Sequence, residues 1–311
     1  MDMKRATREA YGIALAEIAK NNDKIVVLDA DLSKSTKSAD FKKEYPERFF
    51  NAGIAEANMI GMAAGMAATG LIPFASTFAM FAAGRAFEQI RNSVAYPKMN
   101  VKIVGSHSGI TVGEDGATHQ AIEDISLMRS IPNMVVINPC DATETAAAVK
   151  AAAEYNGPVY IRTGRMAVED LHEKGCNFEI GKGEVLKSGD TMAIVATGIC
   201  VKMALDAAEE LSEKGINARV INISTIKPLD EELILKAARE CGKIITVEEH
   251  SIIGGLGSAV SEAVCEGFPV IVRKIGVRDV FGQSGKPEEL LKCYGITKEN
   301  IVAEALLISA V

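Results

Sequence analysis

Short apolar runs rich in valine and isoleucine recur along the chain, and amphipathic segments alternate with them. Strands that are buried on both faces of a parallel sheet have this composition, because neither face meets water. The runs are KIVVLDAD (24–31), VKIVGS (101–106), MVVINP (134–139), PVYIRTG (158–164), TMAIVATG (191–198), ARVINI (218–223), KIITVEEH (243–250) and PVIVRKIG (269–276). The alternation predicts an α/β protein with two domains and mostly parallel sheets. A polar stretch near residues 166–190 separates them, so we expect domains at residues 1–175 and 185–311.

The first 22 residues carry charges throughout and contain no apolar core of a signal peptide. Their pattern predicts an amphipathic helix. The side chains expected to face the core are Tyr11, Ile13, Ala14, Leu15 and Ile18.

The uncharged run at residues 57–83 is long enough to raise the question of a membrane span. Gly70 and Pro73 interrupt it, and alanine and glycine outnumber leucine. We therefore expect no membrane span but a helix, a short strand and a second helix. Gly61 and Gly65 form a GxxxG pattern, which lets helices approach closely. It predicts a buried helix, which would also suit a subunit interface.

Composition excludes several classes of function. The chain has 311 residues and a net charge of −7, without a lysine- or arginine-rich block, which argues against nucleic-acid binding. The six cysteines are scattered and form no CxxC pair. That argues against a zinc or dithiol site and fits the reducing cytoplasm.

Polar side chains follow three of the predicted strands, in DADLSKST (29–36), SHSGITVGEDGATHQ (106–120) and RTGR (162–165). Ligands of open α/β sheets bind beyond the carboxyl ends of the strands. These stretches are therefore the first places to look for a site.

The stretch at 106–120 is the most informative of the three. It holds His107 and His119, with Glu114 and Asp115 between them. One histidine would fit an ordinary surface loop, whereas two histidines and an aspartate in one glycine-containing loop indicate a binding site. The spacing matches no familiar metal-ligand pattern, so we assign no metal ligand in this chain.

We assign no chemical role to two later stretches. HSIIGGLGSAV (250–260) follows a strand and opens a helix, but it lacks the full GxGxxG spacing of a dinucleotide site. Its glycines predict tight packing between strand and helix. DVFGQSGKPEELL (279–291) reads as a turn followed by a helix.

Glu56 stands at the start of the apolar run, within FFNAGIAEANMIGMAAGMAA (49–68). A glutamate near a helix start is favoured by the helix dipole, which would suffice on an exposed helix. A buried carboxyl group without a nearby cation has a raised pKa, however, and it can share a proton with a nitrogen base. The apolar neighbours therefore make Glu56 a candidate for acid–base chemistry.

Several motifs, taken together, resemble the C-terminal half of transketolase over nearly the whole chain. They are ATREAYGIAL, DADLSKS, FNAGIAEANM, STFAMFAAGRAFEQIR, GSHSGITVGEDGATHQAIED, GPVYIRTGR and DVFGQSG. The resemblance implies a pyrimidine-binding domain followed by a smaller C-terminal domain, with thiamine diphosphate as the cofactor.

The resemblance also implies the residues that hold the cofactor. Glu56 matches the activating glutamate, which hydrogen-bonds N1′ of the aminopyrimidine ring. Phe81 would stack on that ring, and Phe78 would line its pocket, although both could be ordinary core residues. A third aromatic residue of many relatives is replaced by Gly84, so either Phe87 fills the space or the pocket differs.

The substrate-binding residues implied by the resemblance are Arg8, Ser35, His107, Asp115, His119 and Arg165. The histidines would contact ketose oxygens near the reacting carbon, and His107 and His119 are counted as catalytic together with Glu56. Asp115 would read a sugar hydroxyl, the serine and the two arginines would bind the sugar phosphate, and Asp31 would lie near the cofactor. Arg162 is a further candidate, with pairing to a neighbouring carboxylate as the alternative.

The GDG…N motif, with which full-length relatives bind Mg²⁺ and the diphosphate, does not occur in this sequence. The resemblance therefore implies a separate N-terminal subunit that holds Mg²⁺ (or Ca²⁺) and completes the site, in an α₂β₂ heterotetramer in which this chain also self-associates. The sequence begins where a complete domain would begin, and a truncated chain is the alternative. The family's usual sugars, xylulose 5-phosphate and ribose 5-phosphate, would place the protein in the pentose phosphate pathway.

Other functions stay open at this stage. Half of a deoxyxylulose-phosphate synthase and the beta subunit of a 2-oxoacid dehydrogenase share the architecture, and His107 favours transketolase over the synthase. The chain could also be a non-catalytic subunit that dimerises through its GxxxG helix. The joint presence of Glu56, His107, Asp115 and His119 argues against that reading.

Overall fold

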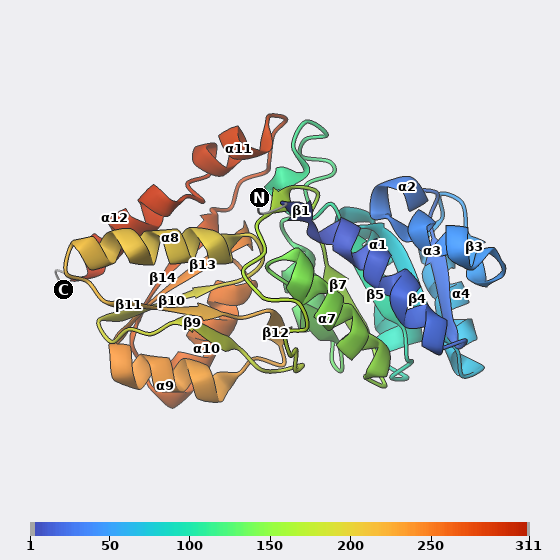
Figure 1. Ribbon diagram of the computed structural model, residues 1–311, viewed down its shortest axis with the longest axis horizontal. Helices are drawn as coiled ribbons and strands as arrows, with labels where there is room; N and C mark the ends of the chain where they lie inside the picture. Colours follow the sequence, from blue (N-terminus) through green and yellow to red (C-terminus); the bar gives the residue numbers. More distant parts are fainter. Residues whose placement is uncertain (1–3, 310–311) are drawn as a thin grey trace.

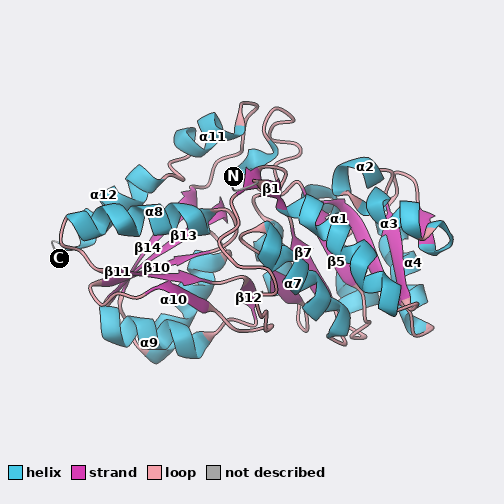
Figure 2. Cartoon of the chain, viewed as in Figure 1, coloured by secondary structure: helices cyan, strands magenta, loops and turns pink. Residues whose placement is uncertain are grey.

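Two sheets covered by helices on both faces make up the computed structural model, which describes residues 4–309 (Figures 1 and 2). The larger sheet has seven strands in the order β12-β6-β7-β5-β4-β2-β3. Its strands are β2 (Ile25–Asp29), β3 (Phe49–Asn51), β4 (Ile72–Phe78), β5 (Lys102–Ser106), β6 (Val135–Ile137), β7 (Val159–Arg162) and β12 (Thr225–Lys227). All neighbours are parallel except β12, which pairs antiparallel with β6.

The smaller sheet has the order β14-β13-β10-β11-β9. Its strands are β9 (Glu184–Lys187), β10 (Met192–Ala196), β11 (Ala218–Asn222), β13 (Lys243–Ser251) and β14 (Ile271–Val277). Only β9 is antiparallel to its neighbour, and it lies in the polar stretch for which the sequence predicts no strand. The predicted α/β class with mostly parallel sheets is confirmed.

Helices and one short strand pair surround these sheets. The helices of the first part are α1 (Thr7–Ile18), α2 (Ser33–Thr36), α3 (Ser38–Glu44), α4 (Glu56–Ala68), α5 (Phe87–Gln89), α6 (Asp124–Ser130) and α7 (Ala142–Glu154). Those of the second part are α8 (Cys200–Glu213), α9 (Glu231–Cys241), α10 (Leu256–Gly267), α11 (Pro287–Cys293) and α12 (Lys298–Ser309). The pair β1 (Arg5–Ala6) and β8 (Ala167–Val168) ties the start of the chain to the segment after β7.

Helix α1 buries most of the face that the sequence predicts. Tyr11, Ala14 and Leu15 are buried against the larger sheet, and Ile18 is half-buried. Ile13 is 51% exposed, so its predicted place in the core is wrong. It lies two positions from both Tyr11 and Leu15, which at 100° per residue turns it to the opposite side of the helix.

The uncharged run folds into helix α4, strand β4 and a π-helical turn at Phe81–Arg85. Met59 and Ile60 of α4 are buried, whereas Gly61 and Gly65 are exposed and have no atoms packed over them. The helix is therefore half-buried in this chain, and its glycine face is not covered. Within residues 4–309, no helix has the length and apolarity that crossing a membrane requires.

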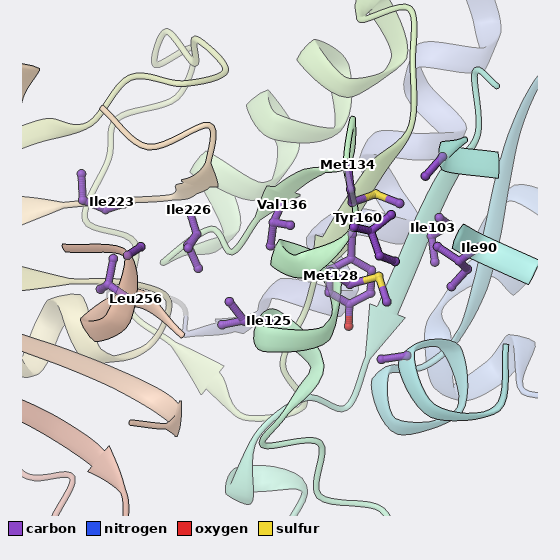
Figure 3. Packing of buried hydrophobic residues seen from close by; sticks show 14 of the residues in the cluster. Ile90, Ile103, Ile125, Met128, Met134, Val136, Tyr160, Ile223, Ile226 and Leu256 are labelled. Carbon is purple, nitrogen blue, oxygen red and sulfur yellow. The ribbon is translucent and has the colours of Figure 1, made fainter. Parts of the chain in front are cut away.

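One hydrophobic cluster connects the two sheets (Figure 3). Met128 and Tyr160 from the larger sheet and its helices share it with Ile223, Ile226 and Leu256 from the second half of the chain. Strand β12 belongs to the second half of the chain but extends the first sheet. The shared core therefore fixes the relative position of the two sheets.

Candidate active site

The parallel strands β2, β4, β5 and β7 end at one edge of the larger sheet, and the candidate residues lie in the segments that follow them. The registers place Phe78 opposite Ser106 and Asp29 opposite Ser76. In Figure 1, the loop after β5 lies near α11, and α2 lies farther along the same side of the molecule. The strand-end loops of the predicted site therefore converge in space.

His107 follows the last residue of β5 and lies at the centre of this edge. Its ring stacks on Phe78 with a centroid distance of 3.9 Å, and its backbone has a φ of 55°. Nδ1 is 2.8 Å from the Ser106 hydroxyl, and Nε2 is 3.2 Å from an Arg8 nitrogen. Burial, together with the positive charges of Arg8 and Arg165, lowers the pKa of His107 to about 3. The ring is thus neutral near pH 7, and because arginine can only donate, Nε2 accepts and Nδ1 carries the proton.

Two phenylalanines and a second histidine extend this group. Phe78 and Phe81 stack with centroids 5.7 Å apart, and the His119 ring meets the Phe81 ring edge-on at 5.3 Å. The Thr118 hydroxyl lies 2.9 Å from Nδ1 of His119 and helps to orient it. The residues proposed for the cofactor ring and for the ketose therefore adjoin one another.

Glu56 is the first residue of α4 and is only 4% exposed. The expectation that it lacks a nearby cation is wrong. Arg85 donates to Oε1 of Glu56 over 3.0 Å, and the same guanidinium lies 4.1 Å from the centre of the Phe81 ring. The π-helical turn that ends at Arg85 creates this contact between residues 29 positions apart, which no local pattern indicates.

Among the described residues, Phe87 forms no ring pair with Phe81, so it does not replace the missing third aromatic residue there. Gly84 is exposed, and Phe87 packs against the hydrophobic cluster that joins the sheets. The side chain that covers Phe81 is Arg85. The pocket therefore differs from one lined by three aromatic residues.

The two candidate phosphate-binding arginines flank the loop at 106–120. Arg8 donates to the Ser35 carbonyl over 2.8 Å, and its Nε is buried without a hydrogen-bond partner among the described residues. Arg165 donates to the Val112 carbonyl over 2.6 Å and lies 3.5 Å from Glu114. The unpaired Nε–H of Arg8 can donate a hydrogen bond to an anionic group of a ligand.

Asp31 and Asp115 are exposed. Asp31 has a φ of 66° and accepts a hydrogen bond from Asn51 over 3.1 Å. Asp115 lies on the loop between the two histidines. Within residues 4–309 neither aspartate is hydrogen-bonded to Glu56 or His107. A functional role for them would therefore be in contacts with a ligand or a partner.

Arg162 does not join this group of side chains. It is buried and donates from Nε to Oδ2 of Asp124 over 2.8 Å. A second nitrogen donates to the carbonyls of Ala121 and Glu249. The alternative that Arg162 pairs with a carboxylate is confirmed, and the carboxylate is Asp124.

Two supporting residues were not identified from the sequence. Asp29, at the end of β2, accepts from the Leu32 amide (2.5 Å) and from the hydroxyls of Thr36 and Ser38 (2.8 and 2.9 Å), and so shapes the segment that carries Asp31. Its place as the first residue of the polar stretch DADLSKST (29–36) is the feature of the sequence that could have indicated it.

The second supporting residue is Glu249, on β13 of the other sheet, which accepts from the Thr111 amide over 2.6 Å. Gly109 packs so closely on this carboxyl group that a Cβ there would overlap it. The three residues EEH (248–250) at the end of a strand give no indication of the loop that Glu249 supports.

Among the described residues, one cluster of metal-ligating types lies close together, at Cys140, Asp141 and His172. Nδ1 of His172 is 2.6 Å from Asp141, and Nε2 is 3.0 Å from Glu184. The hydrogen bond to Asp141 is the main cause that raises the pKa of His172 to about 9. The protonated ring donates to Asp141 and Glu184, so the cluster forms an ion group between the first part of the chain and β9.

Comparison with known proteins agrees with this geometry. Residues 3–170 match the family model of the transketolase pyrimidine-binding domain, and residues 181–301 match that of the transketolase C-terminal domain. The chain belongs to the transketolase family and corresponds to its C-terminal section.

Individual relatives support the same assignment. A protein described as a putative transketolase C-terminal section from Methanocaldococcus jannaschii is 56% identical over 96% of this chain and 94% of its own length. A 6-deoxy-6-sulfo-D-fructose transketolase subunit from a Clostridium species is 45% identical over 96% of this chain and 92% of its own length. Longer relatives are matched over about half of their length.

A solved structure of a split-gene transketolase, in an inactive beta4 tetramer, superposes with a TM-score of 0.90. It is 55% identical, and the match covers 98% of both chains. This chain matches separate subunits over nearly their whole length and longer relatives over about half of theirs. These matches identify it as a transketolase-type subunit.

The family implies thiamine diphosphate with a divalent metal ion, and the side chains around Glu56 fit one end of that cofactor. The carboxylate is buried beside an aromatic face, and a planar nitrogen-containing group, the Arg85 guanidinium, already stacks on Phe81 and donates to Glu56. An aminopyrimidine ring is also planar and nitrogen-containing, so the residues present can bind it.

Proposed function

We propose that this chain supplies the pyrimidine-binding half of a transketolase active site and that a separate N-terminal subunit supplies the rest. The enzyme would transfer a two-carbon ketol unit from a ketose phosphate to an aldose phosphate. The observation that carries the proposal is a buried glutamate beside a stacked aromatic pair, at the strand edge that also holds the two histidines.

In this proposal Glu56 acts on the cofactor's aminopyrimidine. Bound thiamine diphosphate supplies the nucleophilic carbon and the electron sink for cleavage of the carbon–carbon bond. The Glu56 carboxyl group holds a proton at N1′ of the ring, and its burial keeps that proton from exchanging with water. Phe81 and Phe78 orient the ring. General acid–base catalysis of this kind contributes about 10²–10⁴-fold in rate.

The histidines act on the sugar. His107 is neutral, and Ser106 and Arg8 fix its orientation. It can therefore form a hydrogen bond with a ketose oxygen without placing a positive charge beside it. His119 approaches the same aromatic pair from the edge. Asp115, which is exposed on the loop, would accept a hydrogen bond from a sugar hydroxyl.

Arg8 and Arg165 are proposed to bind the phosphate of the sugar, with the Ser35 segment held against Arg8. One relative is named for a sulfonated fructose, and another, from Phocaeicola vulgatus, for apulose 4-phosphate. Each name describes a sugar with an anionic group, to which two arginines are suited. We propose a phosphorylated ketose, with xylulose 5-phosphate of the pentose phosphate pathway as the first donor to test.

The partner subunit would bind the diphosphate and its Mg²⁺ or Ca²⁺ ion, and we propose an α₂β₂ assembly. Asp31, at the strand edge, would face the cofactor in that assembly. The six cysteines are all free, which suits a reducing compartment, and we propose that the enzyme works in the cytoplasm.

The test begins with purification of the tagged chain from its native extract and identification of a stoichiometric partner with a GDG…N segment. The complex is assayed with xylulose 5-phosphate and ribose 5-phosphate, and separately with pyruvate. We expect turnover of the ketose phosphate only. Decarboxylation of pyruvate would instead support a synthase or a 2-oxoacid dehydrogenase.

The matched variants are Glu56→Gln and Glu88→Gln, the second of which changes an exposed glutamate. Glu56→Gln should reduce kcat at least 10²-fold while the complex still assembles, because the proton-sharing group is lost. Glu88→Gln should retain activity. Full activity of the Glu56→Gln complex would refute the catalytic assignment.

A further inference from the structure

The Arg85 side chain contacts both surfaces that the proposed cofactor ring requires. Its guanidinium donates to Oε1 of Glu56 over 3.0 Å and lies 4.1 Å from the centre of the Phe81 ring. An aminopyrimidine that hydrogen-bonds to the Glu56 carboxylate and stacks on Phe81 needs the space between them that the guanidinium fills. A planar cation and a planar ring cannot occupy that space together.

We propose that Arg85 is an internal occupant of the aminopyrimidine position and that thiamine diphosphate must displace it on binding. This inference rests on the proposed function, because it takes Glu56 and Phe81 as the ring-binding residues. It adds a determinant of cofactor affinity that lies outside the residues expected to bind the ring.

The contacts of Arg85 allow such a displacement. Its side chain is 53% exposed, whereas that of Glu56 is 5% exposed. Within residues 4–309, Glu56 is its only hydrogen-bond partner. Arg85 is also the last residue of the π-helical turn and follows Gly84, which is exposed and has no side chain to obstruct it. The guanidinium can therefore turn into solvent by side-chain rotation alone.

The occupant also explains how Glu56 is stable before the cofactor arrives. A buried carboxylate without a partner is costly, and Arg85 provides the missing partner in the free chain. The same contact lowers the apparent affinity for the cofactor, because only the fraction of molecules with Arg85 displaced can bind. The ion pair has one exposed partner, Arg85, and it and the cation–π contact are each weak, so together they should reduce the affinity ~3- to 10-fold.

The experiment is calorimetric titration of thiamine diphosphate, at saturating Mg²⁺, into the cofactor-free complex purified through a tag on this chain. Arg85→Ala should bind the cofactor with a Kd ~3- to 10-fold lower than the wild type. Arg85→Lys keeps the charge without the planar group and should fall between them. Arg91→Ala removes one positive charge from the exposed face of the same segment and should leave the Kd unchanged.

Three outcomes would overturn the inference. An unchanged Kd in Arg85→Ala would show that no displacement is needed, and a higher Kd would show that Arg85 stays in place and helps to hold the cofactor. An equal decrease in Arg91→Ala would assign the effect to overall charge. If the wild-type complex binds no thiamine diphosphate, the proposed function itself fails, and this inference fails with it.

A second readout follows the arginine directly. In NMR spectra of the full chain with ¹⁵N-labelled arginine side chains, the Arg85 signal is assigned by its absence in Arg85→Ala. Assembly with the partner and thiamine diphosphate should move this signal toward that of a solvated arginine. A signal that keeps its ion-paired position in the loaded complex would contradict the displacement.

Discussion

Replacement of Arg162 by methionine provides the sharpest test of how the strand edge is supported. The Arg162 side chain is 2% exposed and that of Asp124 is 0% exposed. The guanidinium donates to Asp124 over 2.8 Å and to the carbonyls of Ala121 and Glu249 over 3.2 and 2.9 Å. It thereby links the loop before α6 to the strand β13 of the smaller sheet.

Methionine would fill most of the volume but would leave the Asp124 carboxylate with one donor, the Tyr160 hydroxyl at 2.8 Å. Oδ1 of Asp124 already has no hydrogen-bond partner among the described residues. Removal of one member of a buried ion pair costs about 3–5 kcal/mol, because the remaining charge is uncompensated. We therefore expect Arg162→Met to lower the free energy of unfolding by about 3–5 kcal/mol.

The assay is urea unfolding followed by circular dichroism, at one fixed protein concentration because the proposed self-association would contribute to stability. The double variant Arg162→Met with Asp124→Asn removes both charges and should lose at least about 2 kcal/mol less than the sum of the single variants. Arg273→Met, at an exposed arginine of β14, is the control and should change stability by less than about 0.5 kcal/mol.

A loss below about 1 kcal/mol in Arg162→Met would refute the structural role. If Arg162→Met raised the KM for the ketose and left the stability unchanged, Arg162 would instead be a substrate-binding residue.

Three further predictions concern the supports of the site and the ion group beside β9. His172 has a pKa of about 9 in the folded chain against 6.5 ordinarily, so its contribution is complete below pH 6.5 and lost as the pH rises through 9. That contribution is on the order of 3 kcal/mol, and His172→Gln should remove this slope from unfolding curves measured between pH 6 and 10; an unchanged slope would disprove the ion-group assignment. Gly109→Ala should raise the KM for the ketose phosphate about tenfold or more, because φ is +75° and the new Cβ would overlap Glu249; wild-type kinetics would contradict this. Asp29→Ala should lower the free energy of unfolding by roughly 2–4 kcal/mol, since three donors lose their acceptor, and a denaturation midpoint equal to the wild type's would count against that role.

Sequence alone was sufficient for most features that depend on local pattern, with Ile13 and strand β9 as the exceptions. The Val- and Ile-rich runs located the parallel strands, because a strand buried on both faces must be apolar throughout. The polar segments after those strands indicated where a candidate site would lie, because parallel strands present their carboxyl ends at one edge. Glu56 stood out as a carboxylate in an apolar helix, and its low exposure agrees with that reading.

Other features were decided only by the tertiary structure, because they join residues that are distant in the chain. The Arg85 contact with Glu56 depends on a π-helical turn that periodicity does not indicate. The support of Thr111 by Glu249 joins residues 138 positions apart, on opposite sides of the junction between the sheets. Likewise, the tertiary structure decides whether Arg162 contacts a substrate or Asp124, because α6 and β13 supply its partners. Local composition specifies which segments form strands, helices and loops, but only three-dimensional packing selects the partner of each buried charge.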